Sequence, residues 1–420
     1  MFRHSSRKIV NRVSTLIVII LTLACSAWSA SYKVLYTFNS NNANPSSGLI
    51  TDAAGNAYGT TFNGGALNQS GTVYELSPTT GYHLLYAFHY KGVGGWHPQG
   101  NLAIDSAGNL YGTTVNGGMK NSICPTGCGV VFELSPSSDG GLWAETVLYG
   151  FCTLANCADG SNPQAGVIFD SAGNLYGTAK TGGNQNCQEE GPGCGTVFEL
   201  SRSQSGWTES VLYAFTGSVA DGGNPSGNLV FDGSGNLYST SPAFWVFELS
   251  PRSGGWHFSI MYQFGGNGDG AEPLSGLTFD TVGNLYGTTA LGGEFGLGIV
   301  FELTPNDSGE WSEAILYNFS GGNDGAKPES ELAIDASGAL YGTTVEGGDS
   351  RGCLGKGCGT VFKLTPQVGQ WIESLFRFPS DGHLGAEPTT PVLLGTAGEV
   401  YGTASGGGRN GQGVMFGIKQ

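Results

Sequence analysis

The sequence predicts an all-β protein, a seven-bladed β-propeller with four antiparallel strands in each blade. A motif that reads Gly-Asn-Leu-Tyr-Gly-Thr-Thr at 108–114 occurs seven times with small changes. The intervals between copies are 53, 65, 62, 48, 55 and 60 residues, and repetition at such a period indicates a solenoid, a propeller or an array. The 73 glycines among 420 residues argue against a helical protein. The Asn position of the motif is held in turn by Asn56, Asn109, Asn174, Asn236, Asn284, Ala339 and Glu399.

One repeat, residues 100–151, contains four short strand-like segments. These segments are 102–105, 109–114, 129–134 and 143–151. Turns rich in Gly, Pro and Asp separate them, and no stretch has the apolar spacing of a helix. Four short antiparallel strands are typical of one propeller blade.

The two ends of the chain predict how the ring closes. An extra copy of the fourth-strand ending, Leu35-Tyr36-Thr37-Phe38, stands near the start, and the last repeat lacks its fourth strand. We therefore expect an N-terminal strand at about 32–38 to complete the blade whose other strands lie in 390–418. This closure removes open sheet edges and sets the blade number at seven.

Aromatic residues recur in almost every repeat. Strand alternation places Val130, Phe132 and Leu134 on one face of their strand, and Tyr149 and Phe151 on one face of theirs. We expect both faces to pack against neighbouring blades. The recurring aromatics have two interpretations, a sugar-binding platform or inter-blade core, and core is favoured because one binding site needs no aromatic in every blade. The residues concerned are Tyr58, Tyr111, Tyr176, Tyr238, Tyr286, Tyr341, Tyr401, Trp143, Trp207, Trp256, Trp311 and Trp371.

Residues 1–30 have the layout of a secretory signal peptide. Four basic residues precede an apolar run over 15–24, and small residues follow it. The run is shorter than the ~20 residues of a membrane span. We expect a secreted chain, extracellular or periplasmic, in which 31–420 form a single propeller domain. Lipid anchoring through Cys25 is the alternative, and we expect no further membrane span and no C-terminal anchor.

The charge of the chain excludes some partners. The formal charge of −16 becomes −20 without 1–30, because that segment holds four basic residues and no acidic ones. Nucleic acid and anionic membrane surfaces are unsuited to so acidic a chain, since phosphates need positive partners. We expect a monomer whose partner is a glycan or an extracellular protein.

Eight cysteines follow the signal segment as four close pairs. Their even number, local pairing and export signal favour disulfides that staple loops. A zinc site would need histidine or further cysteines converging on a pair, and no histidine lies beside any of them. The pairs are Cys124/Cys128, Cys152/Cys157, Cys187/Cys194 and Cys353/Cys358.

The complete repeat pattern resembles a known family. It consists of four segments in a fixed order: Gly-Asn-Leu-Tyr-Gly-Thr-Thr, Gly-Gly, Gly-Thr-Val-Phe-Glu-Leu and Leu-Tyr-x-Phe. The third segment is plainest at 72–76, 196–200 and 360–364. This pattern resembles the GloVer tandem repeat of exported bacterial proteins over essentially all of 32–420. The resemblance implies export and transfers no catalytic residue. The chain departs from the family in its last motif, Gly398 to Ala404, and we expect it to have no sorting tail.

Acidic loops are the first candidate for a site. In a four-stranded blade, the loop between strands two and three and the connection to the next blade share one face, and here both carry the cysteines and most length variation. Variable loops on a rigid scaffold are a common place for binding. Carboxylates at one mouth would suit calcium, the one cofactor that the pattern suggests; the favoured alternative is that each Asp caps its own turn. The residues are Asp159, Asp221, Asp269, Asp324 and Asp381.

The fourth repeat supplies the second candidate. Its Gly-Gly loop is replaced by Ser241-Pro242-Ala243-Phe244-Trp245. This replacement predicts a notch in the face that the variable loops share, with Phe244 and Trp245 beside it. Trp96 and His97 occupy the loop that leads into the second repeat, where the Asp is missing. An aromatic ring there would stack on a sugar. For Trp245 a second interpretation is equally favoured, namely that its ring replaces the packing lost with the missing loop.

The sequence favours a binding or surface-interaction module without evident catalysis. The alternative is a calcium-dependent propeller hydrolase or lyase acting on extracellular carbohydrate or ester, and a purely structural role is the third interpretation. No nucleophile motif lies beside the scattered histidines, and the Gly-rich stretches open no helix. An enzyme is expected to have one polar cluster at the axis, whereas a repeat binder has equivalent shallow sites.

Overall fold

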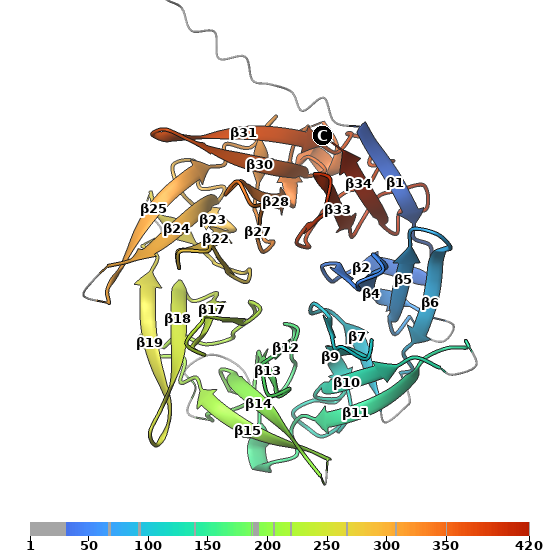
Figure 1. Cartoon of the computed structure of the whole chain (residues 1–420), viewed down its shortest axis with the longest axis vertical. Coiled ribbons are helices and arrows are strands. Elements are labelled where there is room, and N and C mark those ends of the chain that lie inside the picture. The colour runs from blue at the N-terminus through green and yellow to red at the C-terminus, as the bar shows by residue number, and fades with distance from the viewer. Residues whose placement is uncertain are drawn as a thin grey trace, which may run out of the picture.

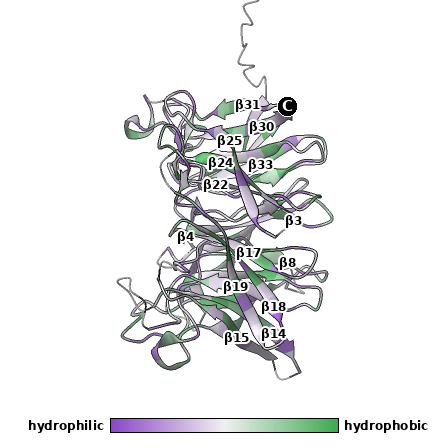
Figure 2. Cartoon of the chain, turned by 90° about the vertical axis from the view of Figure 1, so that its left-hand side faces the viewer, coloured by the Kyte–Doolittle hydropathy of each residue, from purple (hydrophilic) through white to green (hydrophobic). Residues whose placement is uncertain are grey.

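The strands of the described residues form seven antiparallel blades around a central axis (Figure 1). The computed structural model describes residues 31–419 except for 66–68, 91–93, 138–139, 186, 188–192, 205, 219–220, 266–267, 307–308 and 350. The expected signal peptide, 1–30, therefore lies outside the described residues. Seen from the side, loops project from both faces of the ring (Figure 2).

Each blade contains four strands, which run in chain order from the axis outward except that the N-terminal β1 is the outermost strand of the last blade. The innermost strands are β3 (Ile50–Thr51), β8 (Ala103–Ile104), β12 (Ile168–Phe169), β16 (Val230–Phe231), β21 (Thr278–Phe279), β27 (Ala333–Ile334) and β32 (Leu393–Leu394). The second strands are β4 (Ala57–Gly64), β9 (Leu110–Gly117), β13 (Leu175–Ala179), β17 (Leu237–Ser241), β22 (Leu285–Thr289), β28 (Leu340–Thr344) and β33 (Glu399–Ala404).

The outer two positions hold longer strands. The third strands are β5 (Thr72–Ser77), β10 (Val130–Ser135), β14 (Thr196–Ser203), β18 (Trp245–Arg252), β24 (Ile299–Pro305), β30 (Thr360–Gln367) and β34 (Val414–Lys419). The outermost strands are β6 (Gly81–Ala87), β11 (Ala144–Gly150), β15 (Gly206–Ala214), β19 (Gly255–Gln263), β25 (Trp311–Asn318), β31 (Gln370–Arg377) and β1 (Ser31–Thr37). Short additional elements are β2 (Asn42–Pro45), β7 (Gly95–Pro98), β20 (Gly270–Ala271), β23 (Leu291–Gly292), β26 (Gly325–Ala326), β29 (Glu346–Gly347), and the 3₁₀ turns η1 (Ala155–Cys157) and η2 (Cys353–Gly355).

Ring closure follows the predicted route. Strand β1 pairs antiparallel with β34, from Ser31 opposite Lys419 to Thr37 opposite Val414. The last blade therefore has the order β1-β34-β33-β32, and its outermost strand comes from the N-terminal side (Figure 1). The predicted all-β seven-bladed propeller is confirmed, including the N-terminal closing strand.

The repeated motif builds the turn between the first two strands. Asp105 accepts hydrogen bonds from the backbone of Asn109 (2.9 Å), from its side-chain amide (2.9 Å) and from the Tyr111 hydroxyl (3.0 Å). Burial raises the pKa of Asp105, but these hydrogen bonds lower it more, so the carboxyl titrates below its ordinary value. Tyr111 is 2% exposed, as the core interpretation of this tyrosine predicts.

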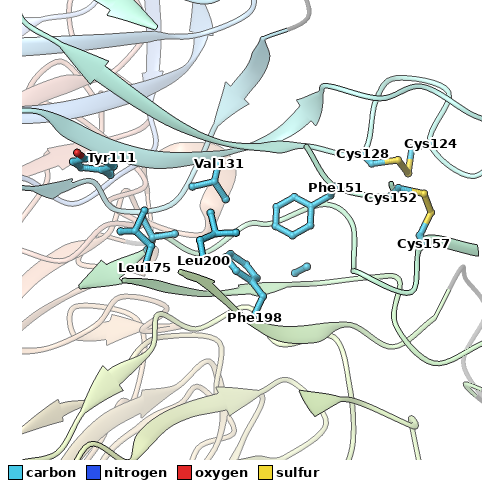
Figure 3. Close-up of a cluster of buried hydrophobic side chains, with 12 residues drawn as sticks. Tyr111, Cys124, Cys128, Val131, Phe151, Cys152, Cys157, Leu175, Phe198 and Leu200 are labelled. Atoms are coloured by element: carbon cyan, nitrogen blue, oxygen red, sulfur yellow. A yellow bond between two sulfur atoms is a disulfide. The ribbon is translucent and has the colours of Figure 1, made fainter. Parts of the chain in front are cut away.

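Phenylalanines join each blade to the next. The Phe that follows a fourth strand meets an aromatic ring of the next blade's third strand edge to face, as Phe151 meets Phe198 at 5.1 Å (Figure 3). Equivalent contacts among the described residues are Phe38–Tyr74, Phe88–Phe132, Phe215–Phe247, Phe264–Phe301, Phe319–Phe362 and Phe378–Phe416. Alternation works as predicted: Phe132 packs toward the first blade and Val131 toward the third.

Candidate functional site

The long loops gather on one face of the ring. In six of the described blades, the connection from the preceding fourth strand pairs with the end of the second strand. Examples are β2 with β4, β7 with β9, β20 with β23 and β26 with β29. The cysteine-bearing loops belong to these connections or to the adjoining hairpins. We call this side the loop face.

An X-Pro pair fixes each connection to the preceding blade. The residue before the proline has φ between 54° and 60° in every described copy: Asn44, His97, Asn162, Asn224, Glu272, Lys327 and Glu387. In all described connections except the one that leaves the fourth blade, the proline then lies on a glycine of the preceding blade; a Cβ on Gly129, for example, would lie 2.5 Å from Pro163 Cδ. Glycine is required there because its φ is +93° and the proline leaves no room for a side chain.

Three residues after each proline, one residue points to the axis. We call these residues the axial ring; around the ring they are Gly48, Asn101, Gly166, Asn228, Gly276, Glu331 and Pro391. From Gly48 to Glu331 glycine alternates with a polar residue, and Pro391 completes the ring. Polar side chains lie over the glycines: a Cβ on Gly276 would lie 2.8 Å from Glu331 Oε2. The sequence interpretation missed this ring, although alignment of the repeats on their prolines contains the signal.

Hydrogen bonds link the axial ring across blades. Asn101 Oδ1 accepts from the Gly48 backbone at 2.7 Å, and Asn228 Oδ1 accepts from the Gly166 backbone at 2.9 Å. Asn228 Nδ2 donates to Glu331 Oε2 at 3.0 Å. Burial raises the pKa of Glu331, and the Asn228 hydrogen bond opposes this rise. These hydrogen bonds form an asymmetric polar cluster at the axis.

A cavity of about 600 Å³ lies along the axis at this ring. Its described lining comes from every blade and consists mainly of amide and hydroxyl side chains and backbone, including Gln99, Gln164 and Thr389. Lys180, Glu329 and Glu331 are the ionisable residues of that described lining. Such a surface suits a neutral ligand with many hydroxyl groups, because amides and hydroxyls both donate and accept hydrogen bonds.

Four of the five candidate aspartates accept hydrogen bonds from the blade connection that carries them and from the strand before it. Asp159 accepts hydrogen bonds from Tyr149 (2.7 Å) and from the Thr153 backbone (2.8 Å). Asp221, Asp269 and Asp324 likewise accept from a tyrosine hydroxyl and a loop backbone N–H. This is the arrangement that the capping interpretation predicts.

The fifth aspartate differs, and the set does not converge. Asp381 is exposed and pairs with His383; the hydrogen bonds from His383 lower the pKa of its carboxyl. Each of the five belongs to a separate connection, and among the described residues no three carboxylates lie close enough to share an ion. Calcium binding by these residues stays a prediction.

Trp96 and His97 are placed together but mostly inside the protein. Trp96 is 8% exposed, with its ring against Tyr90 (centroids 4.9 Å apart). His97 is half-buried, stacks on Phe62 at 4.2 Å and shares a hydrogen bond with Asn116 at 3.1 Å. Burial lowers the pKa of His97. A ligand would therefore reach His97 and Phe62 more easily than the Trp96 ring.

Phe244 and Trp245 have different surroundings. Trp245 is 6% exposed and fills the space over Gly222, where a Cβ would lie 2.5 Å from the indole Cδ1; it replaces packing lost with the missing loop. Phe244 is 40% exposed and has a φ of 78°. It occupies the position that glycine holds in the other described blades, so an aromatic ring is carried there at a conformational cost.

We predict that Phe244→Gly leaves the free energy of unfolding within about 1 kcal/mol of the wild-type value. Removing left-handed strain of about 1–2 kcal/mol offsets the lost ring contacts and the greater unfolded-state entropy of glycine. Urea unfolding measures the difference, with Phe247→Gly, at a fully buried ring, as the strongly destabilised control. A loss above about 2 kcal/mol would mean that the Phe244 ring is structural.

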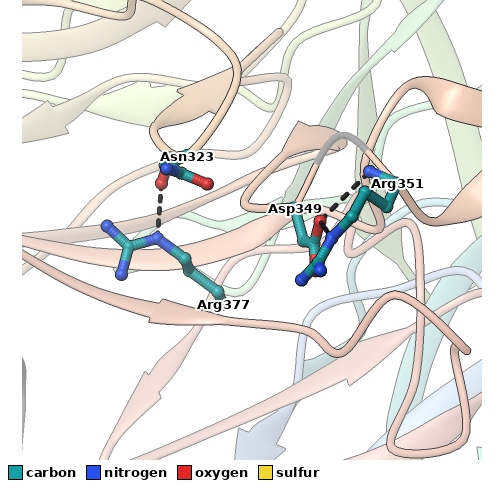
Figure 4. Close-up of polar contacts among 4 residues, drawn as sticks. All are labelled: Asn323, Asp349, Arg351 and Arg377. Carbon is teal, nitrogen blue, oxygen red and sulfur yellow. Dashed lines mark hydrogen bonds and ion pairs between the residues drawn. The ribbon is translucent and has the colours of Figure 1, made fainter.

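A second cleft lies beside the sixth blade. This open cleft, of about 720 Å³, is lined by Asn323, Asp349, Arg351 and Arg377 among others. Arg377 donates to the Asn323 carbonyl, and Arg351 pairs with Asp349 at 2.8 Å (Figure 4). Both contacts lie within the loop face, and the exposed ion pair contributes little stability.

Four disulfides are present among the described residues. They join Cys124 to Cys128, Cys152 to Cys157, Cys187 to Cys194 and Cys353 to Cys358, as predicted. Such bridges are typical of an oxidising compartment. None of the described helical segments has the length and apolar character needed to cross a bilayer.

Comparison with known proteins gives a family and a distant structural likeness. A family model described as the Gloeobacter/Verrucomicrobia repeat matches residues 20–242 and 245–420. No curated protein matches the chain. A crystal structure from Thermus thermophilus, described as an oxidoreductase (glucose dehydrogenase), is similar at 15% identity; the match covers 93% of this chain and 100% of that chain, with a TM-score of 0.43.

Proposed function

Because the chain belongs to the Gloeobacter/Verrucomicrobia repeat family and its ring surrounds a polar axial cavity, we propose that it is an exported module that binds a neutral glycan. The observation that carries the proposal is the composition of the cavity lining. Amide and hydroxyl groups from every described blade face one space, with three ionisable side chains among them. Sugar hydroxyls pair with such groups without the desolvation of a charge.

Residues near the cavity mouth extend the proposed binding surface. Gln99 and Thr389 line both the axial cavity and a side cleft of about 380 Å³ that also includes Phe62 and Asn63. An aromatic ring beside amides is a typical sugar-binding combination. Phe244, the exposed ring of the fourth blade, is the second aromatic that we include. The disulfides support export, since they form in oxidising compartments.

Co-sedimentation with a panel of bacterial and plant polysaccharides, with and without calcium, tests the proposal. We expect binding without new reducing ends, weakened by Gln99→Ala and unchanged by Gln370→Ala on the outermost strand β31. Binding that is lost with Phe244→Gly and kept with Gln99→Ala would move the ligand from the cavity to the fourth blade. No binding to any polysaccharide would contradict the glycan proposal and favour a protein partner.

The asymmetric axial cluster supports a second candidate, a hydrolase or lyase acting on extracellular carbohydrate or ester. Glu331 is a carboxyl whose pKa is raised by burial, which is the property of a general acid. This candidate predicts new reducing ends or free acid in the same assay, lost in Glu331→Gln. Loss of product with a chelator would add calcium to the mechanism. Binding without product in the wild-type protein would reject it.

A further inference from the structure

Two of the disulfides lie against each other. Cys124 and Cys128 come from the loop between β9 and β10, and Cys152 and Cys157 come from the connection between β11 and β12. The four Sγ atoms all lie within 4.8 Å of one another, and Figure 3 shows the two bridges side by side. All four side chains are buried, at 5%, 0%, 4% and 0% exposed. The other two bridges are not part of any such group among the described residues.

From this geometry we propose that the four cysteines, when reduced, form a tetrahedral site for a thiophilic divalent cation, with Zn²⁺ as the bound ion. Zinc prefers four thiolates in tetrahedral structural sites, and pairs of cysteines separated by two to four residues are the common way to supply them. Here three residues separate Cys124 from Cys128, and four separate Cys152 from Cys157. A zinc site needs further cysteines close to a first pair, and the structure brings the two pairs together in a way that the sequence alone did not indicate.

The surroundings of the cluster suit bound thiolates. Asn121 Oδ1 accepts hydrogen bonds from the backbone of Ile123 (2.8 Å) and of Cys124 (2.9 Å), which fixes the direction of its amide. Its Nδ2 then donates to Cys152 Sγ at 2.9 Å. Donors to ligand sulfur orient the ligand and compensate its charge. The second loop is tied to the first, because the Asn162 backbone donates to the Cys128 carbonyl at 2.7 Å.

The two states interconvert by balanced chemistry. A dithiol that reduces one bridge delivers two electrons and two protons and becomes a disulfide, so two dithiols give four thiols. Zn²⁺ then displaces one proton from each thiol. In the reverse direction, two disulfide oxidants take up the four electrons together with four protons from the solvent and become thiols, the two bridges form, and Zn²⁺ is released. The site is therefore metal-bound when reduced and doubly bridged when oxidised.

Alkylation of the wild-type protein tests the proposal without any substitution. The chain is reduced with a dithiol, the reductant is removed under anaerobic conditions, and iodoacetamide is added with or without Zn²⁺. We expect Zn²⁺ to protect the four clustered cysteines and to leave Cys187, Cys194, Cys353 and Cys358 labelled, as read by peptide mass spectrometry. Equal labelling of all eight with Zn²⁺ would overturn the proposal.

Cobalt binding by matched variants gives the second measurement. A cluster-only variant replaces Cys25, Cys187, Cys194, Cys353 and Cys358 by serine, and a half-cluster variant adds Cys152→Ser and Cys157→Ser. Reduced cluster-only protein is expected to bind a single Co²⁺ with the visible bands of a tetrahedral tetrathiolate, displaced by Zn²⁺, and circular dichroism checks folding. Retention of these bands in the half-cluster variant, or their absence from a folded cluster-only variant, would overturn the four-cysteine site.

Discussion

Phe198→Ala is expected to lower the free energy of unfolding by about 3–5 kcal/mol. Phe198 is fully buried in β14, and its ring meets Phe151 of the preceding blade at 5.1 Å. On its own blade the ring lies over Gly177, where a Cβ would be 2.6 Å from Phe198 Cζ. Hydrogen-bonded strands surround the site, so the cavity left by alanine cannot collapse, and the cost lies at the upper end of core truncations.

Urea unfolding, followed by circular dichroism and tryptophan fluorescence, measures this effect. Val282→Ala is the matched control, because Val282 is 81% exposed in a turn and its truncation is expected to change stability by less than about 0.5 kcal/mol. Phe198→Leu is expected to fall between the two. A loss below about 1 kcal/mol for Phe198→Ala would contradict the tight packing between neighbouring blades.

The same contacts explain why the fold could be predicted from the sequence. The tyrosine of the motif, the Phe after each fourth strand and the turn aspartate each act within one repeat or between adjacent repeats. The same local structure is therefore encoded in each of the seven repeats, which makes its pattern easy to identify. The closing strand was predictable for the same reason, since Leu35-Tyr36-Thr37-Phe38 is a fourth-strand ending without a repeat before it.

The candidate site could not be predicted in the same way, because its residues differ between repeats. Asn228 and Glu331 are 103 positions apart in the sequence, and their pairing depends on the radius of the closed ring and on the glycine between them. In the sequence, Cys124/Cys128 and Cys152/Cys157 were each interpreted as a separate local disulfide, and nothing indicated that the two pairs lie together. Their approach depends on how one hairpin loop and one blade connection meet on the loop face.

The packing of neighbouring blades also places a set of carboxyl groups between the outermost strands. Trp-x-Glu begins four of these strands and supplies Glu145, Glu209, Glu313 and Glu373. Glu373 Oε2 accepts a hydrogen bond at 2.7 Å from Tyr317 of the preceding blade. Asp324 of the connection faces the same carboxyl, and Arg377 lies on its own strand. In the fourth blade Phe258 replaces the glutamate and stacks on Tyr213 at 4.5 Å.

Burial and a neighbouring aspartate raise the pKa of three of these glutamates, Glu209, Glu313 and Glu373. Burial, followed by the charge of Asp324, raises the pKa of Glu373 to about 8. Burial, followed by Asp159 or Asp269, raises the pKa of Glu209 and of Glu313 to about 7. A carboxyl with a raised folded-state pKa retains its full contribution to stability below its unfolded pKa, near 4.5. That contribution is lost as the pH rises through the folded pKa.

We therefore predict that the free energy of unfolding falls between about pH 5 and pH 8, by up to about 1.4 kcal/mol per pH unit for each such group. Glu373→Gln should make the protein more stable than wild type at pH 8.5, on the order of 3 kcal/mol, and nearly equal at pH 5, where Glu373 is already neutral. Comparing the two proteins cancels the contribution of other titrating groups, such as His97.

Glu310→Gln, at an exposed turn, is the control and should leave the pH profile unchanged. Equal pH profiles for Glu373→Gln and wild type would contradict a neutral carboxyl between these blades.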